Sequence, residues 1–198
     1  LTGLGGRGHV VYKRSRGGMS EIDRAAAHVL KHSGDGSEVR EFIPYGYDER
    51  QYCSPGINLA VGCLSRTPYG EYPEYHTSLD DLDSVVTPQG LEGGYRALKS
   101  ALEAIERHCH PRVTVLGEPQ LGKRGLYPSV STATTFGDVS LLLDVISWSD
   151  GTLSLIEIAD RCEVPVWHLY PIVDTLMEHG LLAVEAVLGA THAGVAGL

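Results

Sequence analysis

An apolar run of strand length, residues 57–64, lies between two long polar segments, and this arrangement constrains the fold more than any other feature. A continuous apolar run with polar flanks is typical of a strand that is covered on both faces of an α/β sheet. The flanking segments, residues 44–56 and 65–83, are too long and too rich in charged and aromatic residues to be plain turns. Loops of this length inside a compact domain are usually functional or mobile. We therefore expect a site where the two loops meet.

The first half of the chain alternates between strand and helix patterns. The predicted strands are residues 9–13, 39–43 and 57–64. Ser20 and Asp23 have the spacing of a capping box and predict a helix start, and Pro88 has the position of proline in a first helical turn. The stripe Leu91, Leu98, Leu102 and Ile105 predicts an apolar helix face, with the helix ending near His108 and His110, where cationic imidazoles are favoured. This alternation predicts part of an α/β sandwich.

The second half has a different character. Residues 138–187 contain three short helical patterns and a strand-like end, which predict a winged helix-turn-helix. From Asp138 onward the chain has nine acidic residues against one basic residue, Arg161. Since duplex DNA is bound through a basic footprint, this charge predicts no nucleic-acid binding. Trp167, Leu169 and Tyr170 either anchor a protein contact or pack inside the small domain.

Composition sets further bounds on the class of protein. The 198 residues are 42% hydrophobic with a net charge of −9, and no apolar run approaches the roughly 20 residues of a membrane span. We therefore expect no membrane partner. The four cysteines form no Cys-x-x-Cys pair, which favours small buried residues in a reducing, cytoplasmic compartment. Residues 1–5 predict the end of a strand and a turn, so we expect the sequence to begin inside a fold.

Three residues of the two loops have the chemistry of a metal site. Asp48 offers a carboxylate and His76 an imidazole, and zinc binds both kinds of donor. Asp80, four residues after His76, is placed to accept the other imidazole N–H. The alternatives are an Asx turn or a solvated carboxylate at Asp48, a surface histidine at His76, and a cap of the turn at residues 81–83 for Asp80.

The neighbours of these residues are candidates for substrate contacts. Glu49 and Arg50 either form a buried pair that orients the loop or binds a substrate carboxylate, or form a surface ion pair. Tyr75 and Glu74 flank His76 and are candidates to line a pocket. Glu71 is a weaker candidate partner for a free amine of the substrate.

These motifs resemble those of a known family. The residues around His76 are similar to the Tyr-His-Thr-x-x-Asp motif of zinc aminopeptidases and glutaminyl cyclases. The residues around Asp48 are similar to the Ser-Asp-x-x-x-Phe-x-x-x-Gly-Ile loop of the same superfamily. In this chain Tyr47 stands at the Ser position and Tyr52 at the Phe position. With the acidic second half, the chain resembles the C-terminal portion of zinc-dependent aminopeptidase-like proteins that carry a winged helix-turn-helix domain.

The resemblance implies a domain plan. Residues 1–112 would be part of a zinc-exopeptidase-like α/β/α sandwich, residues 113–137 a linker, residues 138–188 the winged helix and residues 189–198 a disordered tail. The winged helix would dock on the catalytic portion or on a second subunit, which leaves a homo-oligomer open.

The resemblance also implies a reaction. Asp48 and His76 would bind one or two zinc ions, and Glu49, Arg50 and Tyr75 would contribute to hydrolysis of a peptide or amide substrate. A further His, a bridging Asp and a Glu general base would lie outside this sequence, and Gly3 stands where other aminopeptidases have an Asp ligand. The alternatives are a non-catalytic interaction module that acts through its winged helix, and a DNA-binding regulator.

Overall fold

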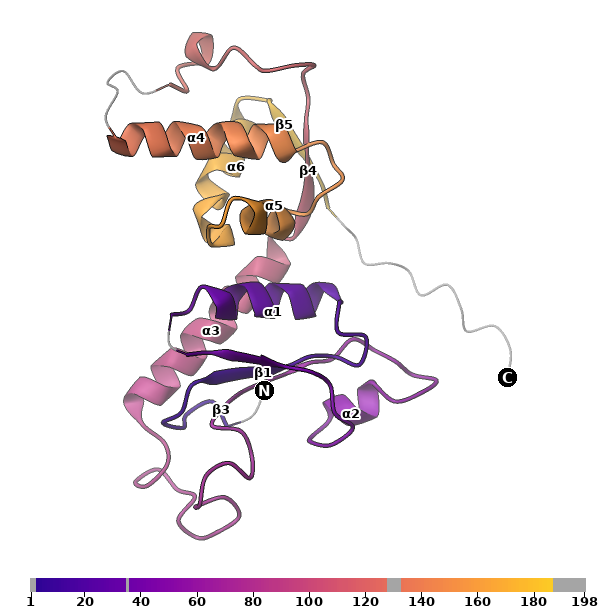
Figure 1. The fold of residues 1–198 in the computed structure, drawn as a ribbon, viewed down its shortest axis with the longest axis vertical. Coiled ribbons are helices and arrows are strands. Elements are labelled where there is room, and N and C mark those ends of the chain that lie inside the picture. The colour runs from indigo at the N-terminus through magenta and orange to yellow at the C-terminus, as the bar shows by residue number, and fades with distance from the viewer. Residues whose placement is uncertain (1–2, 35, 128–132, 187–198) are drawn as a thin grey trace. The chain divides into compact units, whose positions relative to one another are not determined.

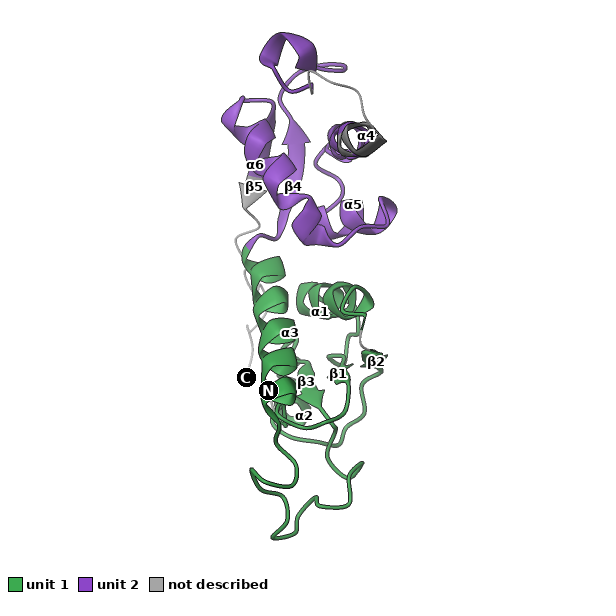
Figure 2. Cartoon of the chain, turned by 90° about the vertical axis from the view of Figure 1, so that its left-hand side faces the viewer, with its two compact units in different colours: residues 1–106 green, residues 107–198 purple. Residues whose placement is uncertain are grey.

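The computed structural model describes residues 3–34, 36–127 and 133–186. The chain divides into two compact units, Leu1–Glu106 and Arg107–Leu198 (Figure 2). The first is an α/β unit and the second contains the winged helix-turn-helix, so the predicted fold class is confirmed. The predicted tail, residues 189–198, lies outside the described residues. Within the described part of the chain, no helix is both long and apolar enough to cross a membrane.

The first unit contains a small mixed sheet. Its elements in chain order are β1 (Val10–Lys13), α1 (Glu21–Lys31), β2 (Glu38–Arg40), α2 (Glu49–Tyr52), β3 (Cys63–Arg66) and α3 (Pro88–Glu106). The strand order is β2-β1-β3, with β1 parallel to β2 and antiparallel to β3. Figure 1 shows α1 on one side of this sheet and α2 on the other.

Strand β1 is the centre of the sheet, and its side chains alternate between the two sides. Tyr12 donates a hydrogen bond of 2.9 Å from its hydroxyl to Asp23 of α1. Lys13, the next residue, forms an ion pair of 2.5 Å with Glu49 of α2 on the other side. All four residues of β1 are buried. The central strand therefore contacts α1 on one side and α2 on the other through polar interactions as well as apolar packing.

Helix α1 begins with the predicted capping box. The Ser20 hydroxyl accepts from the Asp23 backbone N–H, and the Asp23 carboxylate accepts from the Ser20 backbone N–H. Asp23 is fully buried and also accepts hydrogen bonds from Ser15 and Tyr12. The local spacing of Ser and Asp was sufficient to predict where this helix starts.

Helix α3 buries a face of small residues, and this corrects the sequence prediction. Gly94, Ala97 and Ala101 are buried, and the helix packs against α1. A Cβ at Gly94 would lie 2.6 Å from the carbonyl oxygen of Leu4, so only glycine allows this close approach. Of the predicted stripe, Leu91 and Leu102 have 54% and 53% of their surface exposed, whereas Leu98 and Ile105 are half-buried. Tyr95 of the same helix is 63% exposed.

The predicted strand at residues 57–64 is also largely wrong. Strand β3 begins only at Cys63, and residues 57–62 have no regular structure. Asn58 has a left-handed backbone (φ 48°), which no extended strand accommodates. The Leu59 N–H instead closes a turn by donating to the carbonyl of Tyr52. The thiol of Cys53 donates to the carbonyls of Leu59 and Val61, so the run bends back over α2.

The second unit contains the winged helix. Its elements are β4 (Cys109–Val113), η1 (Leu121–Arg124), α4 (Ala133–Trp148), α5 (Leu155–Arg161), η2 (Val166–His168), α6 (Tyr170–Glu178) and β5 (Leu182–Ala186). Strands β4 and β5 pair antiparallel, with Pro111 opposite Val184. A capping box of Ser154 and Glu157 starts α5. Leu155, Ile158, Leu169 and Leu176 are buried in the core of this unit.

Two sequence expectations differ from this unit. His108, Cys109 and His110 were expected at the end of a helix, but α3 ends at Glu106 and Cys109 begins a strand. Pairing with β5 explains the difference, because the partner strand lies more than 70 residues later in the sequence. Helix α4 also begins at Ala133, inside the segment that was expected to be a linker.

Candidate functional site

Asp48 lies at the start of α2 in the first loop. Its side chain makes no capping hydrogen bond and is exposed to solvent. The backbone carbonyl of Asp48 accepts from the N–H groups of Gln51 and Tyr52, which fixes the helical turn. Asp48 therefore does not form the Asx cap, and its carboxylate is solvent-exposed, as the other alternative had it.

Glu49 is held by Lys13 and not by Arg50, which corrects the expected pair. The Glu49 carboxylate is 3% exposed, lies 2.5 Å from the Lys13 Nζ and accepts from the Tyr47 backbone N–H at 3.2 Å. Burial acts to raise the pKa of Glu49, but the hydrogen bonds from Lys13 and the backbone outweigh it and lower the pKa. Arg50 is exposed, because adjacent residues of a helix point in different directions.

Gly46 allows the loop to pass directly over this ion pair. A Cβ at Gly46 would lie 2.3 Å from the Oε1 of Glu49 and 2.7 Å from the Nζ of Lys13. Its φ of +139° is also accessible almost exclusively to glycine. Lys13 donates a further hydrogen bond of 2.6 Å to the carbonyl of Tyr45. The loop of Asp48 is thereby anchored to the central strand.

His76 lies in the second loop in a strained conformation. Its φ is 60°, its side chain is exposed, and its ring stacks on that of Tyr75 with centroids 3.9 Å apart and an interplanar angle of 17°. A left-handed backbone at a residue other than glycine costs of order 1–3 kcal/mol and is concentrated at functional sites. Stacking on Tyr75 limits the orientations that the exposed imidazole can adopt.

Asp80 binds Tyr72 in the described structure. The Tyr72 hydroxyl donates a hydrogen bond of 2.9 Å to the Asp80 carboxylate. Burial and this hydrogen bond raise the pKa of Tyr72 to about 12, so the phenol stays protonated as the donor. The turn that follows is capped by Asp81, whose carboxylate accepts from the N–H groups of Asp83 and Ser84. The alternative role for Asp80, a cap of this turn, therefore belongs to the next residue.

A cluster of tyrosines joins the two loops. The Tyr69 ring lies 5.2 Å edge-on from Tyr47 and 6.4 Å from Tyr75, measured between centroids. Tyr47 precedes Asp48 and Tyr75 precedes His76. Desolvation raises the pKa of Tyr75, and the neighbouring Tyr47 acts in the same direction. Aromatic contacts of this kind contribute about 0.5–1.5 kcal/mol each beyond their burial. The neighbours of the two predicted ligands thus both contact one ring, that of Tyr69.

The sequence interpretation selected only Tyr75 from this cluster. Its signal was present in the density of tyrosine in both loops, at Tyr45, Tyr47, Tyr69 and Tyr72. Glu74 is half-buried beside Tyr75. Glu71, expected as a partner for a substrate amine, instead pairs with Arg40.

A pocket of about 380 Å³ opens beside the cluster, in the first unit. Its wall is lined by Val11, Lys13, Arg40, Glu41, Ile43, Tyr45, Cys63, Ser65, Pro68, Tyr69 and Glu71. The parallel strands β1 and β2 contribute residues at their carboxyl ends, the usual place of ligand sites in open α/β sheets. Burial and the charge of Glu49 raise the pKa of the Cys63 thiol, which keeps this thiol protonated and uncharged.

Around Asp48 and His76, the described residues supply only part of a metal site. Among the described residues, neither Asp48 nor His76 belongs to a group of three or more His, Cys, Asp or Glu ligand atoms close enough to share an ion. One carboxylate and one imidazole fit part of a zinc site, which takes three or four protein ligands.

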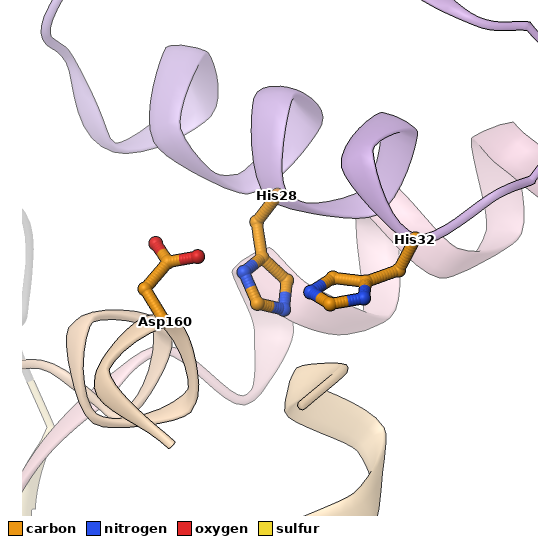
Figure 3. Close-up of side chains that lie close together, drawn as sticks. All are labelled: His28, His32 and Asp160. Atoms are coloured by element: carbon orange, nitrogen blue, oxygen red, sulfur yellow. The ribbon is translucent and has the colours of Figure 1, made fainter. Parts of the chain in front are cut away.

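A pair of imidazoles lies at the C-terminal end of α1. Figure 3 shows His28, which belongs to this helix, and His32, the residue after its last, and their ring centroids are 4.7 Å apart. Residues four apart share a helix face, and His28 is buried. Two imidazole donors do not complete a four-coordinate zinc site, so the pair alone carries no metal assignment.

Comparison with known proteins agrees with this two-part architecture. Residues 1–108 match the model of a family described as "Domain of unknown function (DUF4910)". The chain belongs to this family. Residues 109–184 match a model described as winged helix-turn-helix.

A curated protein and a solved structure, both from Clostridium acetobutylicum, are similar to the chain. One is named "Putative polysaccharide biosynthesis protein with aminopeptidase-like domain" and is 39% identical over 160 residues, which are 80% of this chain and 36% of that protein. The other is the crystal structure of a "putative peptidase", which is 36% identical, has a TM-score of 0.81 and matches 92% of this chain and 40% of its own. The chain spans less than half the length of either relative, and both names agree with the aminopeptidase-like resemblance.

Proposed function

We propose that the chain forms the C-terminal portion of a metal-dependent hydrolase of the aminopeptidase type, which cleaves a peptide or amide. One observation carries this proposal: the tyrosine cluster joins the loop of Asp48 to the loop of His76. The peptidase names of the two relatives support it. His76 and Asp48 are the proposed zinc ligands, with the remaining ligands and the general base supplied by sequence outside this chain.

The residues of this chain would each have a defined part. Bound zinc, one or two ions, would supply an activated water and a polarised carbonyl. The Tyr75 ring would orient the His76 imidazole by stacking, and the Tyr69 ring, which contacts both Tyr47 and Tyr75, would hold the two loops together. Lys13 and Glu49 fix α2, so Glu49 is a positioning residue. Arg50 is exposed and is the proposed contact for a substrate carbonyl or carboxylate.

The chain alone is expected to bind zinc poorly and to hydrolyse nothing. Two donors leave a zinc site open on most sides. The test compares this chain with the full-length protein by metal analysis and by release of product from amino-acid amides and short peptides. Activity and bound zinc should appear only in the full-length protein. A full complement of tightly held zinc on the 198-residue chain, or no hydrolysis by zinc-loaded full-length protein, would contradict the proposal.

The second candidate function is protein interaction through the winged helix, and the surface of α6 favours it over DNA binding. The exposed positions of α6 are Pro171, Asp174, Met177 and Glu178, none of them basic. Arg107 lies over the Tyr170 ring at 4.3 Å and pairs with Asp174. Leu169 and Tyr170 are buried within the unit, so the packing alternative holds for these two.

We expect the winged helix to show no affinity for duplex DNA. A recognition helix reads the major groove with side chains that reach bases and phosphates, and α6 presents carboxylates there. Electrophoretic mobility shifts with random-sequence duplex at low salt would measure this, with a basic winged-helix protein as positive control. Retention in the micromolar range that weakens with rising salt would show phosphate contacts and overturn the expectation.

The four free cysteines support a cytoplasmic location for this proposed enzyme. Cys53, Cys63 and Cys109 are buried and Cys162 is half-buried, without a disulfide. Unpaired thiols are typical of proteins in reducing compartments.

A further inference from the structure

The charged residues Lys13 and Arg40 line the pocket beside the tyrosine cluster, and both already have ionic partners; we call these residues and their partners the polar frame of the pocket. Lys13 is bound by Glu49 and by the carbonyl of Tyr45. Arg40 is bound by Glu71 and, at 2.9 Å, by Glu38. A ligand would therefore find no unpaired charge at Lys13 or Arg40, and an incoming ion would have to displace an existing partner. This frame disfavours a charged occupant.

The surface that the pocket exposes is mostly apolar. Val11 and Ile43 contribute aliphatic carbon, and the rings of Tyr45 and Tyr69 contribute aromatic area. A concave, mainly apolar wall with a few fixed polar groups is typical of a small-molecule site, and about 380 Å³ lies within the range of such sites. The volume accommodates an amino-acid side chain of the larger kind rather than a polymer.

The pocket is continuous with the candidate catalytic loops. Tyr45 and Tyr69 line the pocket, with ring centroids 5.7 Å apart, and the Tyr69 hydroxyl donates to the Tyr45 carbonyl at 3.0 Å. The same Tyr69 ring contacts Tyr47 and Tyr75, the residues next to the two proposed ligands. A group seated in the pocket is therefore separated from the candidate metal loops by one ring.

We propose that this pocket receives a large apolar or aromatic side chain of the substrate, the one adjacent to the amide bond that is cleaved. The inference rests on the proposed hydrolase function and adds its specificity. Ile43 and Tyr45 are the specificity-determining residues, since both line the pocket and are also partly exposed, so that a ligand can reach them.

Binding to the metal-free 198-residue chain tests the pocket independently of catalysis. The probes are glycinamide, leucinamide and phenylalaninamide, titrated while backbone amide signals are followed by NMR. Phenylalaninamide and leucinamide should bind at least about tenfold more tightly than glycinamide, because each added apolar group in a pocket contributes of this order. The shifted signals should include Val11, Ser65 and Tyr69, which line the wall.

A matched pair of variants separates the pocket from general surface effects. Ile43→Ser removes a side chain that is 50% exposed from the wall of the pocket. Ile57→Ser removes one of similar exposure, 59%, from a loop residue that does not line the pocket. Ile43→Ser should weaken phenylalaninamide binding about tenfold and leave glycinamide unchanged, while Ile57→Ser should change neither. Equal affinity for all three probes, or equal losses in the two variants, would overturn the inference.

The outcome also distinguishes this inference from the proposed function. Side-chain-selective binding that depends on Ile43, together with no hydrolysis by zinc-loaded full-length protein, would support the inferred pocket and contradict the proposed hydrolase function. Hydrolysis that shows no preference for apolar side chains and is unaffected by Ile43→Ser would support the proposed hydrolase function and contradict the inferred pocket.

Discussion

Replacing His76 by Ala in the full-length protein is expected to lower amide hydrolysis by more than about 100-fold and to lower zinc stoichiometry. Loss of a residue that only orients a metal ligand typically costs 10–100-fold in metal affinity or activity, so loss of a direct ligand should cost more. The measurements are metal content by elemental analysis and initial rates at saturating zinc. His168→Ala is the control, because His168 is an exposed histidine of the other unit.

The left-handed backbone of His76 calls for two further variants. Alanine is disfavoured at φ 60°, so His76→Ala changes the loop conformation as well as the donor. Asn tolerates this conformation and Gly prefers it. His76→Asn and His76→Gly should therefore lose zinc and activity while keeping the loop, which chemical shifts of Tyr75 and Thr77 would report. Unchanged zinc content in all three variants would remove His76 from the site.

Local signals in the sequence predicted those parts of the fold that local physics decides. The capping box at Ser20 and Asp23 and the cap at Ser154 each depend on hydrogen bonds within four residues, and both helices start where predicted. The winged helix followed from the same kind of short-range pattern. Element starts of this type need no information about distant partners.

The errors arose where distant contacts decide the structure. Glu49 was assigned to its neighbour Arg50, but its partner Lys13 lies 36 residues earlier and meets it across the sheet. In the run at residues 57–64, asparagine tolerates a left-handed backbone, but its presence does not require one, and the φ of 48° at Asn58 ends extended structure there. In α3 the pattern of large apolar residues was taken for the buried face, whereas close backbone contact selects glycine and alanine.

The candidate site was partly accessible from the sequence. Motif spacing selected Asp48 and His76, but it could not show how their loops meet. That contact is made by Tyr47, Tyr69 and Tyr75, which are up to 28 residues apart and have no fixed spacing. The pocket depends on three strands and two loops at once, and nothing in a one-dimensional pattern predicts such a volume.

Replacing Asp23 by Ala is expected to destabilise the first unit by about 3–4 kcal/mol. The carboxylate is fully buried and accepts hydrogen bonds from Ser15 N–H (2.7 Å), Ser15 Oγ (2.6 Å), Ser20 Oγ (2.5 Å) and Tyr12 (2.9 Å). Removing it leaves these donors buried and unpaired, at a cost of about 1–3 kcal/mol for each one that finds no water. Glu21→Ala, an exposed acid in the same helical turn, should cost only about 0.5 kcal/mol.

The two units allow this loss to be localised in the intact chain. Both tryptophans, Trp148 and Trp167, lie in the second unit, and most of the tyrosines lie in the first. Urea unfolding followed by near-ultraviolet circular dichroism of tyrosine should show the transition of Asp23→Ala at lower urea, while tryptophan fluorescence reports the second unit separately. A tyrosine transition that coincides with that of Glu21→Ala would contradict the assigned role of Asp23.

Acid should produce the same loss in the native sequence. Burial acts to raise the pKa of Asp23, but the hydrogen bonds from Ser15, Ser20 and Tyr12 outweigh it, so the folded-state pKa lies below the usual value. Since the unfolded chain then binds the proton more tightly, the contribution of Asp23 is complete above the unfolded pKa of about 3.9 and is lost as pH falls through the folded pKa. Glu49, whose pKa is also lowered, acts in the same direction. Urea midpoints measured from pH 7 to pH 3 should therefore fall more steeply for the native chain than for Asp23→Asn, because the variant has no carboxylate to protonate at this position. Parallel slopes for the two proteins would show that the acid sensitivity arises elsewhere.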